Sequence, residues 1–286
     1  MLPPGVYKIG AAFPAVPEPR IKSPSKAVDV ESVADEQRNN ANVVDPHSTI
    51  SAKFLANCKG LTFLHVNVRS LLPKVEEIRR LLDDSKAAFL AISESWLDSS
   101  VCDGEVHIDG YNFVRKDRDR HGGGVGIYVR NGINFNIRND LDKDELECLF
   151  LDIIFPKTKP FIIGACYRPP SDNDFIDRFK SILELISPGT ELFMLGDFNY
   201  CFSRNDSTVK RYKSMLSSFS LEQLITNATR ITATTNSVLD HVLTNFKSKI
   251  SISGVLESSF SDHNVIYCVR GKSPKAFSLP STKIVC

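Results

Sequence analysis

The stretch that decides the fold runs from Leu61 to Glu94 and reads LTFLHVNVRSLLPKVEEIRRLLDDSKAAFLAISE. Its start, LTFLHV, is a short apolar run typical of a buried strand, and AAFLAIS (87–93) is a second one. Between them Pro73 opens a helical segment, since proline is tolerated in a helix's first turn. Apolar residues share one face of that helix: Val75, Ile78, Leu81 and Leu82. A strand, a helix and a strand in this order predict two parallel strands with a crossover helix.

The apolar runs that follow along the chain look like antiparallel strands. Residues 124–130 (GVGIYVR) and 133–138 (INFNIR) are joined by Asn131-Gly132, a dipeptide that favours a tight hairpin. Further strands and helices follow: strands at 147–155, 159–167 and 191–199, helices around 175–186 and 212–219, and short strands near VLDHVLT, ISISGVL and NVIYCVR. Helices separated by strand pairs predict an α/β fold, a four-layer α/β sandwich with two mixed β-sheets packed face to face and flanked by helices.

The two ends of the chain differ in composition from its middle. Seven of the 15 prolines lie in the first 46 residues, which contain only two aromatic residues. So few apolar groups cannot offset the entropy of ordering, and we expect residues 1–55 to be a disordered tail. Residues 56–271 are expected to form one domain, followed by a second disordered tail at 272–286.

Composition excludes several classes of protein. The 35 basic and 34 acidic residues leave a net charge of +1, which excludes a polycation that binds nucleic acid by bulk charge. The 7 cysteines form no CxxC motif, which argues against a zinc ribbon and favours reduced core thiols in an intracellular protein. No apolar run reaches the ~18 residues of a membrane span, and the N-terminus lacks a signal-peptide pattern, so we expect no membrane contact.

Polar side chains follow several of the predicted strands, where a sheet holds them rigidly at its rim. Asn67 follows LTFLHV, Glu94 follows AAFLAIS, and Asp197 and Asn199 end ELFMLGDFN. Each one alone is more typical of a turn or a helix cap. Together with Asp262, however, these carboxylates and amides would form an oxygen-rich site for Mg²⁺ or another hard cation.

A histidine and an aspartate near the C-terminus form a second candidate group. His263 follows Ser261-Asp262, and Asp240 lies inside VLDHVLT. A single histidine is usually structural or exposed. A carboxylate that kept it protonated, for which Asp240 is the candidate, would let His263 bind a phosphoryl oxygen.

These motifs, in this order, resemble those of the endonuclease/exonuclease/phosphatase superfamily. They are Asn67-Val-Arg, Ser93-Glu-Ser-Trp, Tyr167-Arg-Pro-Pro, Gly196-Asp-Phe-Asn, Asp240 and Ser261-Asp-His. More narrowly, NVRSLLPK, ISESWLD, GYNFVRKDRDRHGGGVGIYV, CYRPPS, LGDFN and VLDHVLTN resemble the apurinic-type endonuclease domain of non-LTR retrotransposons of the jockey/CR1 kind. The resemblance runs from about residue 60 to 270, nearly the whole expected domain.

The resemblance implies a role for each matching residue. Glu94 would be the main metal-binding glutamate, with Asn67 beside it in the metal and phosphate site, and Asp262 would contribute to the metal or histidine network. Asp197 would position or deprotonate the attacking water. The residues implied to bind phosphate or water, or to orient one that does, are Tyr167, Asn199, His263 and Asp240. Some family members carry an acid where this chain has Arg69, so the metal site would depend chiefly on Glu94.

The reaction implied is hydrolysis of a DNA phosphodiester bond with Mg²⁺, or alternatively Mn²⁺, leaving a 5′-phosphate and a 3′-hydroxyl. The implied partners are DNA and a separate or lost reverse transcriptase. We expect a monomer that is nuclear if active. Two alternatives stay open: a phosphatase or phosphodiesterase of the same superfamily, and a catalytically silent retrotransposon-derived fragment.

Two segments are candidates for contact with DNA. The densest basic cluster is RKDRDRH (115–121), and its Arg115 and Lys116 are expected to bind the phosphate backbone, with a solvated loop of self-paired charges as the alternative. The stretch TRITATTNSVLD (229–240) resembles the family's hairpin loop, which tends to touch DNA near the cut, so Thr229 and Arg230 are also candidate contacts.

Overall fold

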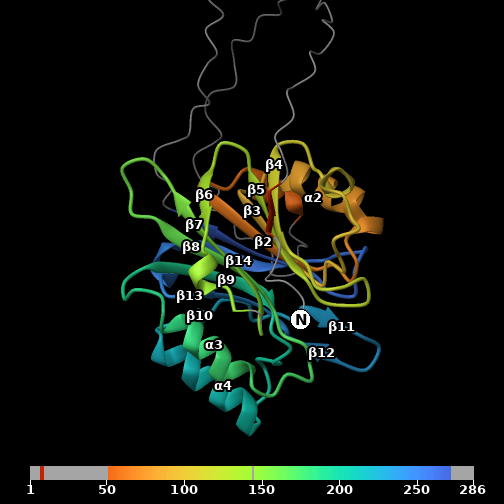
Figure 1. Ribbon diagram of the computed structural model, residues 1–286. Helices are drawn as coiled ribbons and strands as arrows, with labels where there is room; N and C mark the ends of the chain where they lie inside the picture. The colour runs from red at the N-terminus through yellow and green to blue at the C-terminus, as the bar shows by residue number, and fades with distance from the viewer. Residues whose placement is uncertain (1–6, 10–50, 144, 272–286) are drawn as a thin grey trace, which may run out of the picture.

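Two β-sheets pack face to face at the centre of the computed structural model, which describes residues 7–9, 51–143 and 145–271 (Figure 1). The first sheet has seven strands, in the order β1 (Tyr7–Ile9), β4 (Tyr111–Lys116), β5 (Val125–Arg130), β3 (Phe89–Ser93), β2 (Leu61–Asn67), β15 (Val265–Arg270) and β14 (Ile250–Leu256). Strands β2 and β3 are parallel, and the short helix η1 (Leu72–Lys74) and helix α2 (Val75–Ser85) connect them. The predicted strand–helix–strand unit is therefore confirmed.

The second sheet has six strands, in the order β10 (Glu222–Gln223), β13 (Asp240–Thr244), β9 (Glu191–Asp197), β8 (Phe161–Tyr167), β7 (Glu147–Ile154) and β6 (Asn134–Ile137). Its β8 and β9 are parallel, while β7 and β8 form the expected antiparallel pair. The other elements are helices α1 (Ala52–Ala56), α3 (Phe175–Leu183) and α4 (Ser207–Ser218), the hairpin of β11 (Arg230–Ile231) and β12 (Asn236–Ser237), and the 3₁₀ helices η2 (Asp103–Val106), η3 (Asn139–Leu141) and η4 (Lys247–Lys249).

Phenylalanine side chains fill the space between the sheets. Phe63 of the first sheet stacks on Phe193 of the second with ring centroids 4.5 Å apart, and Phe89 lies 4.9 Å from Phe63. On the outer faces, α2 packs over the first sheet, and α3 and α4 pack over the second (Figure 1). This order of layers confirms the four-layer sandwich. Because the layers are apolar, polar side chains collect at the rims where strands end.

The predicted hairpin at Asn131-Gly132 is wrong. Strand β5 lies between β4 and β3 in the first sheet, whereas β6 pairs with β7 in the second. Since both edges of β5 are already paired, it has no edge left for β6. Gly132 has φ +85°, a conformation that glycine adopts without strain, and lets the chain pass between sheets there.

Three elements fall where the sequence predicted a tail or a loop. Strand β1 lies within the expected N-terminal tail and pairs antiparallel with β4, and α1 begins at Ala52. Strand β4 includes the first residues of the basic cluster. The rest of the expected N-terminal tail, up to residue 50, and the C-terminal tail at 272–286 lie outside the described residues. No helix in the described part of the chain is long and apolar enough to cross a membrane.

Candidate active site

Residues from both sheets meet at one rim of the sandwich. Asn67 ends β2, Glu94 follows β3, and Asp197 ends β9. Strands β13 and β15 run antiparallel to β9 and β2, so Asp240 at the start of β13 and His263 just before β15 reach the same rim. The register pairs Asp240 directly with Asp197. Sequence positions nearly 200 residues apart are thus brought together by strand direction alone.

A single buried amide joins the two carboxylates that come from different sheets. Asn67 Nδ2 donates to Glu94 Oε1 at 2.8 Å and to Asp197 Oδ2 at 2.9 Å. Trp96 Nε1 donates to the other oxygen, Glu94 Oε2, at 3.2 Å. Asn67 is fully buried, so its amide holds both carboxylates in fixed orientations toward each other. Two acids so close together form a site suited to a hard cation.

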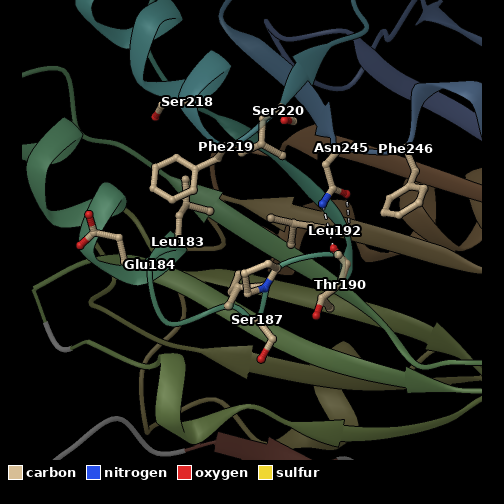
Figure 2. Close-up of a pocket in the computed structure, with 14 residues that line it drawn as sticks. Leu183, Glu184, Ser187, Thr190, Leu192, Ser218, Phe219, Ser220, Asn245 and Phe246 are labelled. Carbon is tan, nitrogen blue, oxygen red and sulfur yellow. Dashed lines mark hydrogen bonds between the residues drawn. The ribbon is translucent and has the colours of Figure 1, made fainter.

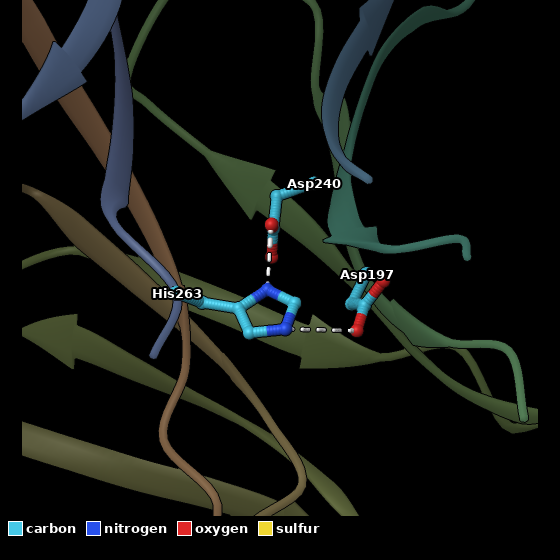
Figure 3. Close-up of side chains that lie close together, drawn as sticks. All are labelled: Asp197, Asp240 and His263. Atoms are coloured by element: carbon cyan, nitrogen blue, oxygen red, sulfur yellow. Dashed lines mark hydrogen bonds and ion pairs between the residues drawn. The ribbon is translucent and has the colours of Figure 1, made fainter. Parts of the chain in front are cut away.

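The histidine lies between two aspartates (Figure 3). His263 Nδ1 contacts Asp240 Oδ2 at 2.8 Å, and its Nε2 lies 4.0 Å from Asp197 Oδ2. One ligand atom from each of the three lies within 4.8 Å of the others, and all three residues are buried. The imidazole therefore presents one nitrogen to each carboxylate.

Burial and mutual charge set the ionisation of these groups. Burial raises the pKa of Asp197 to about 7, and the nearby Asp240 carboxylate adds to the rise. Burial alone would lower the pKa of His263, but Asp240 and Asp197 raise it to about 9. Burial would raise the pKa of Asp240, yet His263 holds it below its ordinary value. In the metal-free protein at neutral pH, an imidazolium paired with Asp240 therefore faces an Asp197 that can gain or lose a proton.

Tyr167 and Asn199 lie on either side of Asp197. Tyr167 is the Cα partner of Asp197 in the β8–β9 ladder, and burial, followed by the charges of Glu94 and Asp197, raises the pKa of its phenol. It stays a protonated donor at neutral pH. Asn199 donates its backbone N–H to Asp197 Oδ1 at 3.0 Å and its side-chain Nδ2 to the Arg168 carbonyl at 2.8 Å. Its side-chain amide thus holds the loop after β9.

Asp262 lies at the edge of the site and contacts two arginines. Its Oδ2 accepts from Arg69 Nη1 at 3.2 Å and from Arg230 Nη2 at 2.8 Å. Burial would raise the pKa of Asp262, but His263, Arg69 and Arg230 hold it below its ordinary value. A metal at this carboxylate would compete with both guanidinium groups.

The burial of Arg115 and Lys116 contradicts their expected contact with DNA. Arg115 is 0% exposed, and its Nη2 donates to the Val101 carbonyl at 2.7 Å. Lys116 is 8% exposed and its ammonium is paired with Asp142. As neighbours on β4 they point to opposite faces of the strand, and both faces are covered: Arg115 contacts Asp103 on one side, and Lys116 contacts Asp142 on the other. Neither side chain is accessible to a phosphate backbone.

The two candidates from the hairpin differ from each other. Thr229 is 0% exposed, and its Oγ1 accepts the backbone N–H of Asp240 at 3.1 Å, so it fixes the start of β13 and is not accessible to DNA. The Arg230 side chain is 39% exposed and contacts Asp262, while the Arg230 backbone forms a β-bridge with His263. Of the two, only Arg230 presents its side chain to solvent beside the site.

The sequence did not point to His65, which lies behind Asp240. His65 Nδ1 is 3.6 Å from Asp240 Oδ1, and its Nε2 lies 3.1 Å from Ser93 Oγ. Burial lowers the pKa of His65 to about 4, so the ring is neutral. The available signal was a polar residue inside the apolar run LTFLHV, since a buried strand tolerates one only with a partner.

A hollow of about 470 Å³ lies at the opposite rim of the second sheet, near the start of β9 (Figure 2). The Asn245 side chain in its lining is engaged within the protein: it accepts the Leu192 N–H at 2.9 Å and donates to the Thr190 carbonyl at 2.8 Å. Glu184 is the only acidic or basic residue in its lining. It therefore lacks the groups for acid–base or phosphate chemistry.

Residues 63–263 match the endonuclease/exonuclease/phosphatase family. The chain belongs to this family. No curated protein matches the chain by sequence.

Solved structures share the fold at low identity. The endonuclease domain of TRAS1, a telomere-specific non-LTR retrotransposon, superposes with a TM-score of 0.61 and 16% identity, over 75% of this chain and 100% of that one. An AP endonuclease from Archaeoglobus fulgidus has a TM-score of 0.58 and 12% identity, over 73% and 99%. The 3′ phosphatase NExo from Neisseria, bound to a product DNA hairpin, has a TM-score of 0.58 and 15% identity, over 73% and 98%.

Proposed function

We propose that this chain is a metal-dependent endonuclease that nicks DNA to leave a 3′-hydroxyl, and that it derives from a non-LTR retrotransposon. The observation that carries the proposal is the convergence of Glu94 and Asp197 on the Asn67 amide, next to the Asp240–His263 pair. This set combines acid, base and cation-binding groups, as phosphodiester hydrolysis requires. The likeness to the TRAS1 endonuclease domain and to an AP endonuclease supports DNA as the substrate.

The donor set fits Mg²⁺ or Mn²⁺. Glu94 offers hard carboxylate oxygens and faces Asp197 across the Asn67 amide, an anionic arrangement that a cation would neutralise. The Asn67 oxygen accepts the Arg69 backbone N–H at 3.1 Å and would have to leave it to bind the metal. His263 is less suited to hold the metal, since metal ligands must be deprotonated and its pKa is raised to about 9. When bound, the metal would neutralise charge on the phosphate.

The remaining groups act on the water and the phosphate. Asp197, whose pKa is about 7, is the general base that takes a proton from the attacking water. His263, held protonated by Asp240, binds a phosphoryl oxygen and stabilises its growing negative charge. Tyr167 donates a hydrogen bond from its phenolic hydroxyl to another phosphate oxygen. The freed 3′-hydroxyl would prime reverse transcription, and an active monomer would work in the nucleus.

A second candidate is hydrolysis of phosphate monoesters, because the same groups can perform it. The likeness to a 3′ phosphatase favours this alternative. Two assays separate the phosphatase from the endonuclease. One measures phosphate release from 3′-phosphorylated DNA and from inositol phosphates, and the other measures plasmid nicking.

The test of the endonuclease is nicking of supercoiled plasmid with and without Mg²⁺. We expect nicking by the unaltered chain and its loss in His263→Ala. The matched control is His107→Ala, since His107 also contacts an aspartate, Asp109 at 3.1 Å, but at the surface. Nicking that survives His263→Ala, or binding to DNA without cleavage in any divalent metal, would contradict the proposal; the second result would favour a silent fragment.

A further inference from the structure

A shallow pocket of about 400 Å³ opens beside Glu94, outside the catalytic groups described above. Its wall includes two basic and two aromatic residues that take no direct part in the proposed hydrolysis: Arg69, Lys74, Trp96 and Phe260. Asp262 completes the wall. The volume falls within the range of roughly 300–1,000 Å³ that is usual for small-ligand clefts.

Positive charge exceeds negative charge around this pocket. The Arg69 side chain is 50% exposed and pairs with Asp262, whose single carboxylate also serves Arg230 at 2.8 Å. Lys74 adds an ammonium that donates to the Val68 carbonyl and, at 3.2 Å, to the Arg69 carbonyl. Two guanidinium groups thus share one carboxylate. An exposed ion pair is weak, so the Arg69 guanidinium can turn its remaining N–H donors to a phosphate at little cost.

The aromatic wall is held in place from behind. The indole Nε1 of Trp96 donates to Glu94 Oε2 at 3.2 Å, and its backbone N–H donates to the Gly123 carbonyl at 3.0 Å. Phe260 is half-buried and packs against the outer core of the first sheet. A fixed, partly exposed aromatic ring is a surface on which a nucleic-acid base can stack. The pocket therefore joins an aromatic ring to phosphate-binding cations.

We propose that this pocket is a subsite for one nucleotide of the DNA strand next to the scissile phosphate, with the base stacked on Trp96 and its phosphate bound by Arg69. The proposal rests on the proposed function, because Trp96 links the pocket to Glu94 of the catalytic site. A base and a phosphate together explain why an aromatic ring and an arginine line one hollow, which a bare phosphate or an inositol phosphate would not.

The chain offers a direct probe, since Trp96 is its only tryptophan. The full chain in EDTA, where no cleavage interferes, is titrated with a short single-stranded oligodeoxynucleotide while tryptophan emission is recorded. We expect saturable quenching, and none with inorganic phosphate or inositol hexakisphosphate. Arg69→Gln should weaken binding roughly tenfold, the loss of one charge-assisted hydrogen bond. Asp262→Asn removes the carboxylate that competes with the phosphate for Arg69, so this variant should bind the oligonucleotide more tightly.

The matched control is Arg211→Gln. Arg211 lies on α4, its side chain is 54% exposed, and it contacts Asp177 at 2.5 Å, so it resembles Arg69 in exposure and pairing but lies away from the pocket. Its variant should bind as the unaltered chain does. Trp96→Phe lacks the fluorescent probe, so its binding is measured by the anisotropy of a labelled oligonucleotide. This variant should bind the oligonucleotide several-fold more weakly than the unaltered chain.

Three outcomes would overturn the subsite: no quenching, equal affinity of Arg69→Gln and Arg211→Gln, or equal quenching by the inositol phosphate. The same preparation is tested for plasmid nicking with Mg²⁺. Nicking without quenching rejects the subsite and leaves the endonuclease proposal standing. Quenching without nicking supports a nucleotide pocket and rejects the endonuclease.

Discussion

Strand β9 carries an acidic residue at each end, and the two lie in opposite surroundings. Glu191, at its start, accepts hydrogen bonds from Arg270 Nε at 2.6 Å and from Lys249 Nζ at 2.6 Å. Burial would raise the pKa of Glu191, but these two cations hold it below its ordinary value. Asp197, at the other end, is 1% exposed and faces Asp240, and its pKa is raised to about 7 by burial and by that carboxylate.

The contrast separates a residue whose contacts stabilise the fold from one whose surroundings fit its proposed role as general base. Glu191 is paired with Arg270 and Lys249, so its end of β9 is an ion pair that joins the second sheet to the first. Asp197 instead neighbours the Asp240 carboxylate, the Asn67 amide and His263, whose imidazole can lose its proton. Such an unbalanced, buried carboxylate costs stability and is typical of functional sites.

The largest expected effect is that of Asp197→Asn. If Asp197 is the general base, the nicking rate with Mg²⁺ should fall by about 10³-fold. The free energy of unfolding in EDTA should stay unchanged or rise, because the repulsion from Asp240 is removed. Plasmid nicking and urea unfolding measure the two quantities. Glu191→Gln is the control on the same strand and should keep its nicking rate; a variant of Asp197 that still nicks at the normal rate would contradict the contrast.

The sequence predicted where these two acids sit but not what surrounds them. Asp197 was recognisable because it ends an apolar run within Gly196-Asp-Phe-Asn, and other strands were recognisable from similar apolar runs. The partner of Glu191 lies 79 residues away at Arg270, and no local pattern specifies that pairing. The roles assigned to the site residues from the resemblance stay predictions.

Errors in the prediction arose where distant strands decided the outcome. The Asn131-Gly132 dipeptide favours a hairpin locally, but β3 and β4 occupy both edges of β5. Arg115 and Lys116 looked exposed because charge was counted along the chain, whereas other segments cover both faces of β4 and bury the two side chains. Local sequence gives the propensity of a segment, and the competition for strand edges is settled only in the assembled sheet.

The second effect concerns pH and the histidine beside Asp197. The folded pKa of His263 is about 9, against an ordinary 6.5, so protonation stabilises the metal-free fold by roughly 3 kcal/mol. Because the folded pKa is the higher one, this stabilisation is complete below pH 6.5 and is lost as the pH rises through about 9. Urea unfolding in EDTA measures the free energy of unfolding of the unaltered chain and of His263→Gln. The difference between these two free energies should shrink as the pH rises over this range. A constant difference would mean that the pKa is not raised.

The smallest effect tests the other end of β9. Glu191→Gln should lower the free energy of unfolding by about 2 kcal/mol, since it leaves Arg270 and Lys249 without their shared carboxylate. The surface pair of Glu222 and Lys247 is the matched control, and Glu222→Gln should cost less than about 1 kcal/mol. The folded pKa of Glu191 lies below its ordinary 4.5, so the loss should be constant from pH 6.5 upward and fade only as the pH falls below 4.5. If the stability loss in Glu191→Gln instead changed between pH 6.5 and 9, a group that titrates near neutral pH would act at both ends of β9. The two ends would then not differ as described.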